Sequence, residues 1–385
     1  MSDLKVCTPL TPQPQSYTLR STIRLLFHYI SAHLYTMFSG VFTPKFPAHR
    51  EELRIETQDP QLGIVSLYVH YYSSNSRTSR QGKSQVHTTC DLEKSNDQQS
   101  SDKLCILVHG LASTPHSKYL SPYIHQGLKL GYDVIALALR GSVGEGVDHY
   151  HAGLTADVHA LLASQQCAQY KHIVLIGFSL GGQVVLRYAY EGGDARVKSV
   201  GAVCPPIDLE VVQCHLDRWG QAIYRRFLLA SLKKAYQKIW HNAHQSGTPL
   251  KASLKRALKS QTIYEWDQYV VLSRYDFDSV KSYHAQVSLN TEQLSQLCIP
   301  SCLLFSRLDP VIPLRDIWHH IEPFVRHKGK SPSVQTQVKV LEAGGHIRFP
   351  SRVDLSIDLS PSHMSHQLFT WMEECVDAKQ PIDTQ

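Results

Sequence analysis

One five-residue stretch, Gly-Phe-Ser-Leu-Gly at 177–181, constrains the fold of this chain more than any other. It follows an apolar run, 173–176, that predicts a buried strand, and it precedes a run, 183–190, that predicts a helix. A turn this tight between a strand and a helix requires almost no side chain two residues before and two residues after the serine. The pattern therefore predicts a strand–turn–helix unit in which Ser179 projects at the carboxyl edge of a sheet.

The composition narrows the class of protein. The chain has 385 residues, of which 42% are hydrophobic and 19% are charged, and apolar runs recur along most of its length. This profile is typical of a globular protein with a substantial core, and it excludes disordered and fibrous chains. The length alone suggests two or three domains, but α/β folds often form one long unit with an insertion. We therefore expect one core with a cap.

Strand-like and helix-like runs alternate through most of the chain. Short, almost entirely apolar runs predict strands at 52–55, 64–72, 105–108, 134–139, 173–176, 197–203, 302–305 and 337–341. Helices are expected before residue 131, over 154–167, after the serine turn and over 362–375. This alternation predicts an α/β fold with a mostly parallel central sheet, and the fully apolar runs predict that helices flank both of its faces.

The domain organisation follows from where the strand pattern stops. Nearly a hundred residues between the strands at 197–203 and 302–305 show helical periodicity, which predicts a helical cap inserted before the strand that carries the acidic residue discussed below. The expected divisions are an N-terminal extension with an amphipathic helix (1–47), the first part of the core (48–208, with a polar loop at 73–102), the cap (209–297), the second part of the core (298–378) and a tail (379–385).

Two further residues give the serine a chemical context. A serine hydroxyl is a weak nucleophile, so Ser179 needs a base and a carboxylate that orients the base. Asp309 follows one predicted strand, and His346 follows the last one, in a loop after two glycines. Each alone has an ordinary interpretation as a turn or loop residue. Because parallel strands end at one sheet edge, the three together, in the order serine, acid, histidine, predict a catalytic triad.

An oxyanion hole is the remaining requirement of this chemistry, because the tetrahedral intermediate carries negative charge. His109-Gly110-Leu111 ends an apolar strand, and Gly110 allows the backbone to turn an amide inward. The backbone N–H groups of Leu111 and Leu180 are therefore the two candidate donors. His109 is an alternative base, but its position favours a structural hydrogen-bonding role.

No cofactor or metal is expected. The sequence lacks the G-x-x-x-x-G-K-[ST] loop of nucleotide-binding proteins and a G-x-G-x-x-G that opens a βαβ unit. The nine cysteines form an odd set, and several lie in apolar runs, so a disulfide framework is not expected. Cys298 and Cys302 have no second pair at zinc-ligand spacing.

Taken together, these motifs resemble one branch of a known superfamily, the YheT-type branch of the α/β-hydrolases, which includes bacterial esterases and animal lipase-like proteins. The resemblance extends from about residue 104 to about residue 350. The segments that carry it are His109-Gly110-Leu111, Leu139-Arg140-Gly141 with Gly144-Glu145, residues 151–157, the serine turn, residues 275–278, Asp309-Pro310 and Gly344-Gly345-His346. Ser142-Val143 departs from the branch, which often has a cysteine and a small residue there.

The resemblance implies a serine hydrolase that cleaves carboxylic esters through an acyl-serine intermediate. The residues carried over are Ser179, Asp309 and His346. Short or medium acyl esters are the implied substrates, with monoacylglycerols as one candidate, and a role in lipid metabolism follows. The alternative is a hydrolase-fold lipid-binding protein without turnover. The departures from the branch leave the acyl-chain preference open.

Two segments raise the question of membrane contact. Residues 17–42 carry apolar side chains at helical spacing, interrupted by Arg and His, which predicts a helix that either docks on the protein or lies in the plane of a membrane. Residues 218–262 contain ten Lys or Arg and no Asp or Glu. Peripheral contact of this segment with an anionic bilayer and an ordinary solvated helix face both stay open.

The expected location is the cytoplasm or the inner surface of a membrane. The first sixteen residues are polar and interrupted by proline, so they do not resemble a signal peptide. Nucleic-acid binding is not expected, because no recognised binding module accompanies the basic segment.

Overall fold

The computed structural model of the chain describes residues 29–37, 43–59, 63–74, 101–325, 335–357 and 360–377. Nearly all of the polar loop predicted at 73–102, the tail predicted at 379–385, and residues 17–28 and 38–42 of the predicted N-terminal helix therefore lie outside the described residues.

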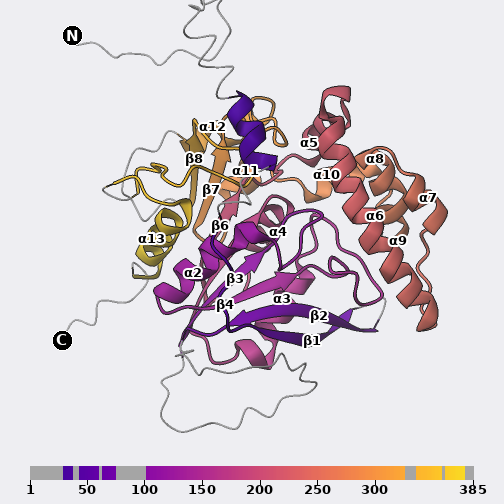
Figure 1. Cartoon of the computed structure of the whole chain (residues 1–385), viewed down its shortest axis with the longest axis horizontal. Coiled ribbons are helices and arrows are strands. Elements are labelled where there is room, and N and C mark those ends of the chain that lie inside the picture. Colours follow the sequence, from indigo (N-terminus) through magenta and orange to yellow (C-terminus); the bar gives the residue numbers. More distant parts are fainter. Residues whose placement is uncertain are drawn as a thin grey trace, which may run out of the picture.

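A single eight-stranded sheet forms the centre of the described chain (Figure 1). Its strands are β1 (Glu51–Asp59), β2 (Gly63–Tyr72), β3 (Lys103–Val108), β4 (Asp133–Ala138), β5 (His172–Phe178), β6 (Val197–Val203), β7 (Ser301–Ser306) and β8 (Thr336–Leu341). The strand order is β1-β2-β4-β3-β5-β6-β7-β8. β1 pairs with β2 and β2 pairs with β4 in antiparallel fashion, and all other pairs are parallel. The predicted mostly parallel sheet is confirmed.

Burial along the central strands explains their apolar sequence. Every residue of β4 and β7 is buried, and so is every residue of β3 and β5 except the first. Successive residues of a strand point to opposite faces, so full burial means that both faces of the sheet are covered. The sequence of these strands therefore lacks the alternation that a half-exposed strand would show.

The helices of the core cover the sheet. They are α2 (Ser121–Lys129), α3 (Ala156–Ala163), α4 (Leu180–Glu191), α12 (Trp318–Val325) and α13 (Met364–Asp377), with short 3₁₀ turns η2 (Lys118–Leu120) and η3 (Gln165–Cys167). α2 and α13 pack against each other, and α4 packs against β3, β5 and β6. The helix predicted over 154–167 is shorter than expected, because Ser164 is extended, with ψ of 157°, and divides α3 from η3.

The cap lies between β6 and β7 in the sequence and beside the core in space (Figure 1). Its elements are α5 (Leu209–Asp217), the 3₁₀ turn η4 (Trp219–Gln221), α6 (Ala222–Gln245), α7 (Leu254–Lys259), α8 (Ile263–Trp266), the π-helix η5 (Asp267–Val271), α9 (Leu272–Arg274), α10 (Val280–Val287) and α11 (Thr291–Ser295). Several of these helices begin at a side-chain cap. At the start of α5, for example, the Asp208 carboxylate accepts the Val211 N–H. The predicted helical insertion before the strand that precedes Asp309 is confirmed.

A buried cluster of charges joins the cap to the core. The Arg140 guanidinium, which follows β4, donates to the carboxylates of Asp157 on α3, Asp59 at the end of β1, and Asp148. Arg274, at the end of α9 in the cap, donates to Asp148 and Asp59 as well. Burial by itself lowers the pKa of Arg140, but the surrounding carboxylates outweigh it and raise the pKa, so the guanidinium stays charged. The cluster thus joins Asp59 of the core to Arg274 of the cap, which are more than two hundred positions apart in the sequence.

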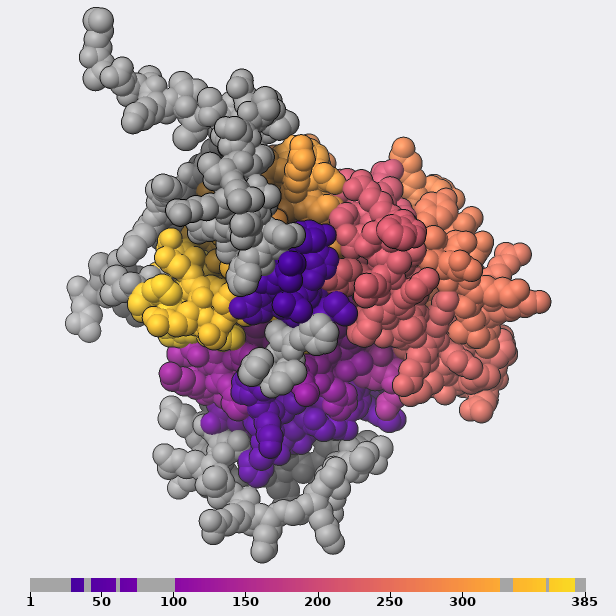
Figure 2. Space-filling view, turned by 45° about the horizontal axis from the view of Figure 1, so that its top comes forward, coloured from indigo at the N-terminus to yellow at the C-terminus, as the bar shows by residue number. Residues whose placement is uncertain are grey.

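A helix at residues 29–37 lies against the cap, next to α6 (Figure 2). His33 Nδ1 and the Tyr224 hydroxyl are 2.6 Å apart and hydrogen-bonded. The described part of the predicted N-terminal helix therefore docks on the protein. In the portion of the chain that is described, no helix has the length and apolar character needed to cross a bilayer. The seven described cysteines are all free, so no disulfide is formed among them.

Candidate active site

The serine turn has the backbone geometry that its glycines predict. Ser179 has φ of 52° and ψ of −121°, and α4 begins directly after it at Leu180, earlier than the sequence suggested. A Cβ on Gly177 would lie 2.2 Å from the Gly181 carbonyl oxygen, and a Cβ on Gly181 would lie 2.2 Å from the Val108 carbonyl oxygen. Both glycines are required because β5, α4 and the end of β3 approach each other there. Ser179 is thereby held in a left-handed conformation that a non-glycine residue rarely adopts.

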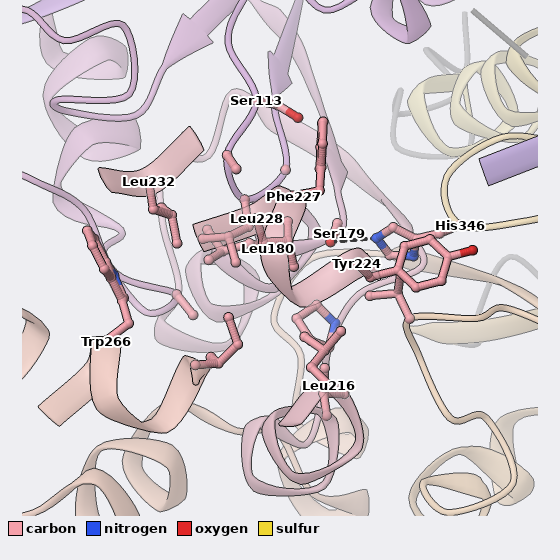
Figure 3. A pocket seen from close by; sticks show the side chains of 18 of the residues that line it. Ser113, Ser179, Leu180, Leu216, Tyr224, Phe227, Leu228, Leu232, Trp266 and His346 are labelled. Carbon is pink, nitrogen blue, oxygen red and sulfur yellow. Dashed lines mark hydrogen bonds between the residues drawn. The ribbon is translucent and has the colours of Figure 1, made fainter. Parts of the chain in front are cut away.

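Among the three predicted triad residues, His346 lies within hydrogen-bond distance of both of the others. His346 Nε2 is 2.8 Å from Ser179 Oγ (Figure 3), and His346 Nδ1 is 2.9 Å from Asp309 Oδ2. The Asp309 carboxylate is buried, and its other oxygen accepts the N–H groups of Val311 and Ile312 at 2.8 and 3.0 Å. These two bonds hold the carboxylate so that Oδ2 faces the imidazole. In this arrangement the Nδ1 proton points to Asp309 and leaves Nε2 free to accept from the serine.

The two predicted oxyanion donors lie beside Ser179 in the same cavity. The amides next to Leu111 are already engaged, since Gly110 N–H donates to the Tyr119 hydroxyl and Ala112 N–H to the Tyr150 hydroxyl, both at 3.0 Å. Within the ranges that the structure describes, no hydrogen bond joins the Leu111 or Leu180 amide to a protein acceptor. Both N–H groups are thus available for a substrate oxygen.

His109 is hydrogen-bonded through both ring nitrogens. Nδ1 lies 2.8 Å from the Gly110 carbonyl, and Nε2 lies 3.2 Å from the Leu139 N–H and 3.0 Å from the Ser142 hydroxyl. Burial lowers the pKa of this imidazole to about 4, so it is neutral. These contacts give His109 the structural role that the sequence favoured, and Ser142 supplies one of them at the position where the chain departs from the YheT-type pattern.

The cavity that opens at Ser179 has a volume of about 530 Å³ and lies between the core and the cap. Apolar side chains of the cap form much of its wall (Figure 3): Leu216, Tyr224, Phe227, Leu228, Leu232 and Trp266. A pocket whose cap side is largely apolar, with Ser179 and His346 at one point of its lining, suits a hydrophobic ligand whose polar reacting group lies at that point.

One residue at the site was not found by sequence reasoning. The Thr36 hydroxyl on the N-terminal helix accepts the backbone N–H of His346 at 2.8 Å and donates to the Ala32 carbonyl at 2.8 Å. A Cβ on Gly345 would lie 2.3 Å from the Thr36 hydroxyl, so this glycine permits the helix to sit on the histidine loop. The only signal in the sequence is the pair of glycines at 344 and 345, which allows another element to approach the backbone closely. The pair does not show which element approaches.

A metal ion could be considered at one group of three side chains here. Ligand atoms of Cys204, Asp309 and His346 all lie within 4.8 Å of one another. Burial, and then the charge of Asp309, raises the pKa of the Cys204 thiol well above its ordinary value, which disfavours the thiolate that a metal requires. Nδ1 of His346 already binds Asp309. These residues fit a hydrogen-bonded triad better than a metal centre.

Comparison with curated proteins gives relatives that are named as an esterase or as abhydrolase domain-containing proteins. The chain is 28% identical over 251 residues to the Escherichia coli (strain K12) protein named "Putative esterase YheT", an alignment that covers 63% of this chain and 69% of that protein. It is 24% identical over 275 residues to "Abhydrolase domain-containing protein 2" of Drosophila melanogaster, covering 68% and 67% of the two chains. The resemblance to YheT seen in the motifs is confirmed.

Among solved structures, the esterase Pf2001 of Pyrococcus furiosus is 18% identical, with a TM-score of 0.48, over 86% of this chain and 91% of that one. The naproxen esterase of Bacillus subtilis is 13% identical, with a TM-score of 0.45, over 92% and 98%. The sequence profile of the alpha/beta hydrolase family matches residues 105–355. That range includes the serine turn, the whole cap and the loops of Asp309 and His346. The chain therefore belongs to the alpha/beta hydrolase family.

Proposed function

We propose that the protein hydrolyses carboxylic esters through an acyl-serine intermediate. The observation that supports this most is the continuous hydrogen-bonded series from Asp309 through His346 to Ser179, with distances of 2.9 and 2.8 Å, whose serine and histidine line a mostly apolar cavity. The esterase and hydrolase names of its relatives agree with this chemistry.

In the first half of the proposed reaction, the ester carbonyl lies between Ser179 and the amides of Leu111 and Leu180. His346 Nε2 takes the proton of Ser179 Oγ as that oxygen attacks the carbonyl carbon. The two N–H groups stabilise the oxygen of the tetrahedral intermediate. His346 then gives its proton to the departing alcohol, and the acyl group stays on Ser179.

Deacylation uses the same groups in reverse order. His346 removes a proton from water, the resulting hydroxide attacks the acyl-serine, and Ser179 leaves with the proton restored to it. Asp309 stabilises the imidazolium in both halves. The backbone bonds that hold its carboxylate keep that orientation fixed throughout.

For the substrate, we propose an ester with a short or medium acyl chain, monoacylglycerols included, and a place in lipid metabolism. The support is the apolar wall that the cap gives to the cavity. A p-nitrophenyl ester series from acetate to palmitate, run beside monoacylglycerols, tests this. Turnover confined to the acetate ester would contradict the assignment of the cavity to an acyl chain.

Active-site labelling tests the chemistry independently of the substrate. A fluorophosphonate reacts with a serine that a histidine activates. We expect the wild-type chain to be labelled and Ser179→Ala to be unlabelled. Equal labelling of both would place the reactive serine elsewhere, and no labelling of the wild type would favour a lipid-binding protein without turnover.

A further inference from the structure

Two elements that are distant in sequence, and that both contribute residues to the cavity lining, carry exposed apolar side chains. On the N-terminal helix they are Tyr29, Ile30, Leu34 and Met37, and on η4 and α6 they are Trp219, Ile223 and Phe227. We call these seven side chains the rim. Each is at least half exposed, and Trp219 is 91% exposed. Single exposed apolar side chains are ordinary, but a group of this size is a mark of an interaction surface.

Direct contacts hold the two halves of the rim together. The hydrogen bond between His33 and Tyr224 joins the N-terminal helix to α6, and the His33 and Tyr224 rings lie 5.7 Å apart. Burial lowers the pKa of His33, so a charge on its ring does not disturb this contact near neutral pH. The helix and α6 lie side by side in Figure 2. The rim is therefore one surface.

Part of the rim also lines the entrance to the cavity. Met37, Ile223 and Phe227 are exposed on the outside and line the cavity on the inside. Whatever covers the rim therefore meets the opening that leads to Ser179. A protein bound tightly there would close the opening, whereas a lipid surface would present acyl chains to it.

Positive charge lies next to the rim on the cap side. Arg218 precedes Trp219 and Arg226 precedes Phe227, and both arginines are exposed. They begin the segment 218–262, which has ten Lys or Arg and no Asp or Glu. Basic residues close to an anionic bilayer are attracted to it. Aromatic and aliphatic side chains beside Arg and Lys are the combination found in helices that lie in a membrane interface.

We propose that the rim binds an anionic lipid surface and that substrate enters the cavity from that surface. Binding by the rim does not depend on Ser179, but the entry of a substrate rests on the proposed ester hydrolysis. The seven apolar side chains insert into the lipid surface. The basic segment 218–262 adds a weaker electrostatic attraction to the anionic head groups.

Vesicle sedimentation of the full chain tests this proposal. The Ser179→Ala background prevents turnover of the lipids, so a failure of binding is separate from a failure of the chemistry. We expect sedimentation with phosphatidylcholine vesicles that contain phosphatidylglycerol, and much less with phosphatidylcholine alone. Trp219→Ser with Leu34→Ser removes two rim side chains that do not line the cavity, and we expect affinity to fall about tenfold or more.

Ile64→Ser is the matched control, because Ile64 is an exposed apolar residue on β2, outside the rim. It should sediment like its parent. With Ser179 intact, the Trp219 and Leu34 variant should still hydrolyse a water-soluble ester at the wild-type rate. Equal sedimentation of rim variant and control, equal binding to both vesicle types, or absence of binding would overturn the proposal. So would vesicle-independent dimerisation that the rim variant abolishes, because a second copy would then be the occupant.

Discussion

At the carboxyl edge of the sheet, contacts with backbone atoms fix the positions of the triad side chains. In the cap, the side of each helix that faces the core determines which side chains line the cavity. Ser179 is fixed by the contacts of Gly177 and Gly181, and Asp309 by two amides. Much of the cap's part of the cavity wall, by contrast, comes from one side of α6, while other positions of that helix carry exposed basic residues. The core thus fixes the geometry of the reaction with little tolerance for change, and the cap offers side chains that can vary without disturbing it.

The largest expected effect lies in the core. Ser179→Ala or His346→Ala should lower kcat by about 10⁶-fold, or about 8 kcal/mol, because either change removes the activated nucleophile. Steady-state kinetics on a p-nitrophenyl ester measures this. A decrease of less than tenfold in either variant would show that the triad is assigned wrongly.

Acid should destabilise the place where cap and core meet. Burial lowers the pKa of His149 to about 4 and of His151 to about 3. Between these values and the ordinary 6.5, the unfolded chain binds protons that the folded chain does not, so the stability is present above pH 6.5 and is lost as the pH falls toward 4. Each imidazole should cost about 2 kcal/mol at about pH 5.

Urea unfolding at about pH 7.5 and about pH 5 measures this loss. His241 lies on the exposed side of α6, so His241→Gln should show the same pH dependence as the wild type. Equal unfolding midpoints at both pH values would mean that the two buried imidazoles become charged without unfolding, as they would if the cap opened readily.

The charge cluster between the two regions predicts a loss of stability. Arg140→Met leaves the buried carboxylates of Asp157 and Asp59 without their main partner, so the free energy of unfolding should fall by about 3–5 kcal/mol. Arg54→Met is the matched control, because Arg54 forms an exposed ion pair with Glu145 and should cost less than about 1 kcal/mol. Similar urea midpoints for the two variants would contradict a structural role for the cluster.

In the cap, a change in the wall should alter selectivity but leave the reaction intact. Leu232 is a buried wall residue of α6, and Leu232→Trp fills part of the cavity. The ratio of kcat/KM for a long ester to that for the acetate ester should fall by about 10- to 200-fold. Leu258→Trp, on the exposed side of α7, should leave the ratio unchanged. A uniform loss on all esters would mean that Leu232 supports the reaction geometry itself.

The smallest effect is expected where the N-terminal helix meets the histidine loop. Thr36→Val leaves the His346 N–H without its acceptor and should lower kcat by roughly fivefold, or about 1 kcal/mol. Thr36→Ser keeps a hydroxyl and should restore the rate. The change should also move the acidic limb of the pH–rate profile, since Thr36 acts by positioning the imidazole. An unchanged rate and profile would reduce Thr36 to a packing residue.

Some local features followed from the sequence with little ambiguity. The five residues of the serine turn are enough to predict that its two glycines are sterically required. The fully apolar strand sequences predict a sheet covered on both faces. The end of the helix predicted over 154–167 was wrong, because Ser164 leaves the helix in a segment that otherwise keeps its apolar spacing. The Ser164 hydroxyl donates to the Leu161 carbonyl at 2.6 Å, and a local hydrogen bond of this kind does not show in a periodic pattern.

Sequence by itself determined the alternation of strands and helices, the place of the cap, and the order of Ser179, Asp309 and His346, because each of these depends on neighbours in the chain. Only the tertiary structure decided the 2.8 and 2.9 Å contacts of His346 with Ser179 and Asp309. It also decided the hydrogen bond between Thr36 and the histidine loop, and the ion pair of Asp59 with Arg274. A helical repeat shows which side of a helix is apolar, but not what packs against it. That choice belongs to elements that meet only when the whole sheet has formed.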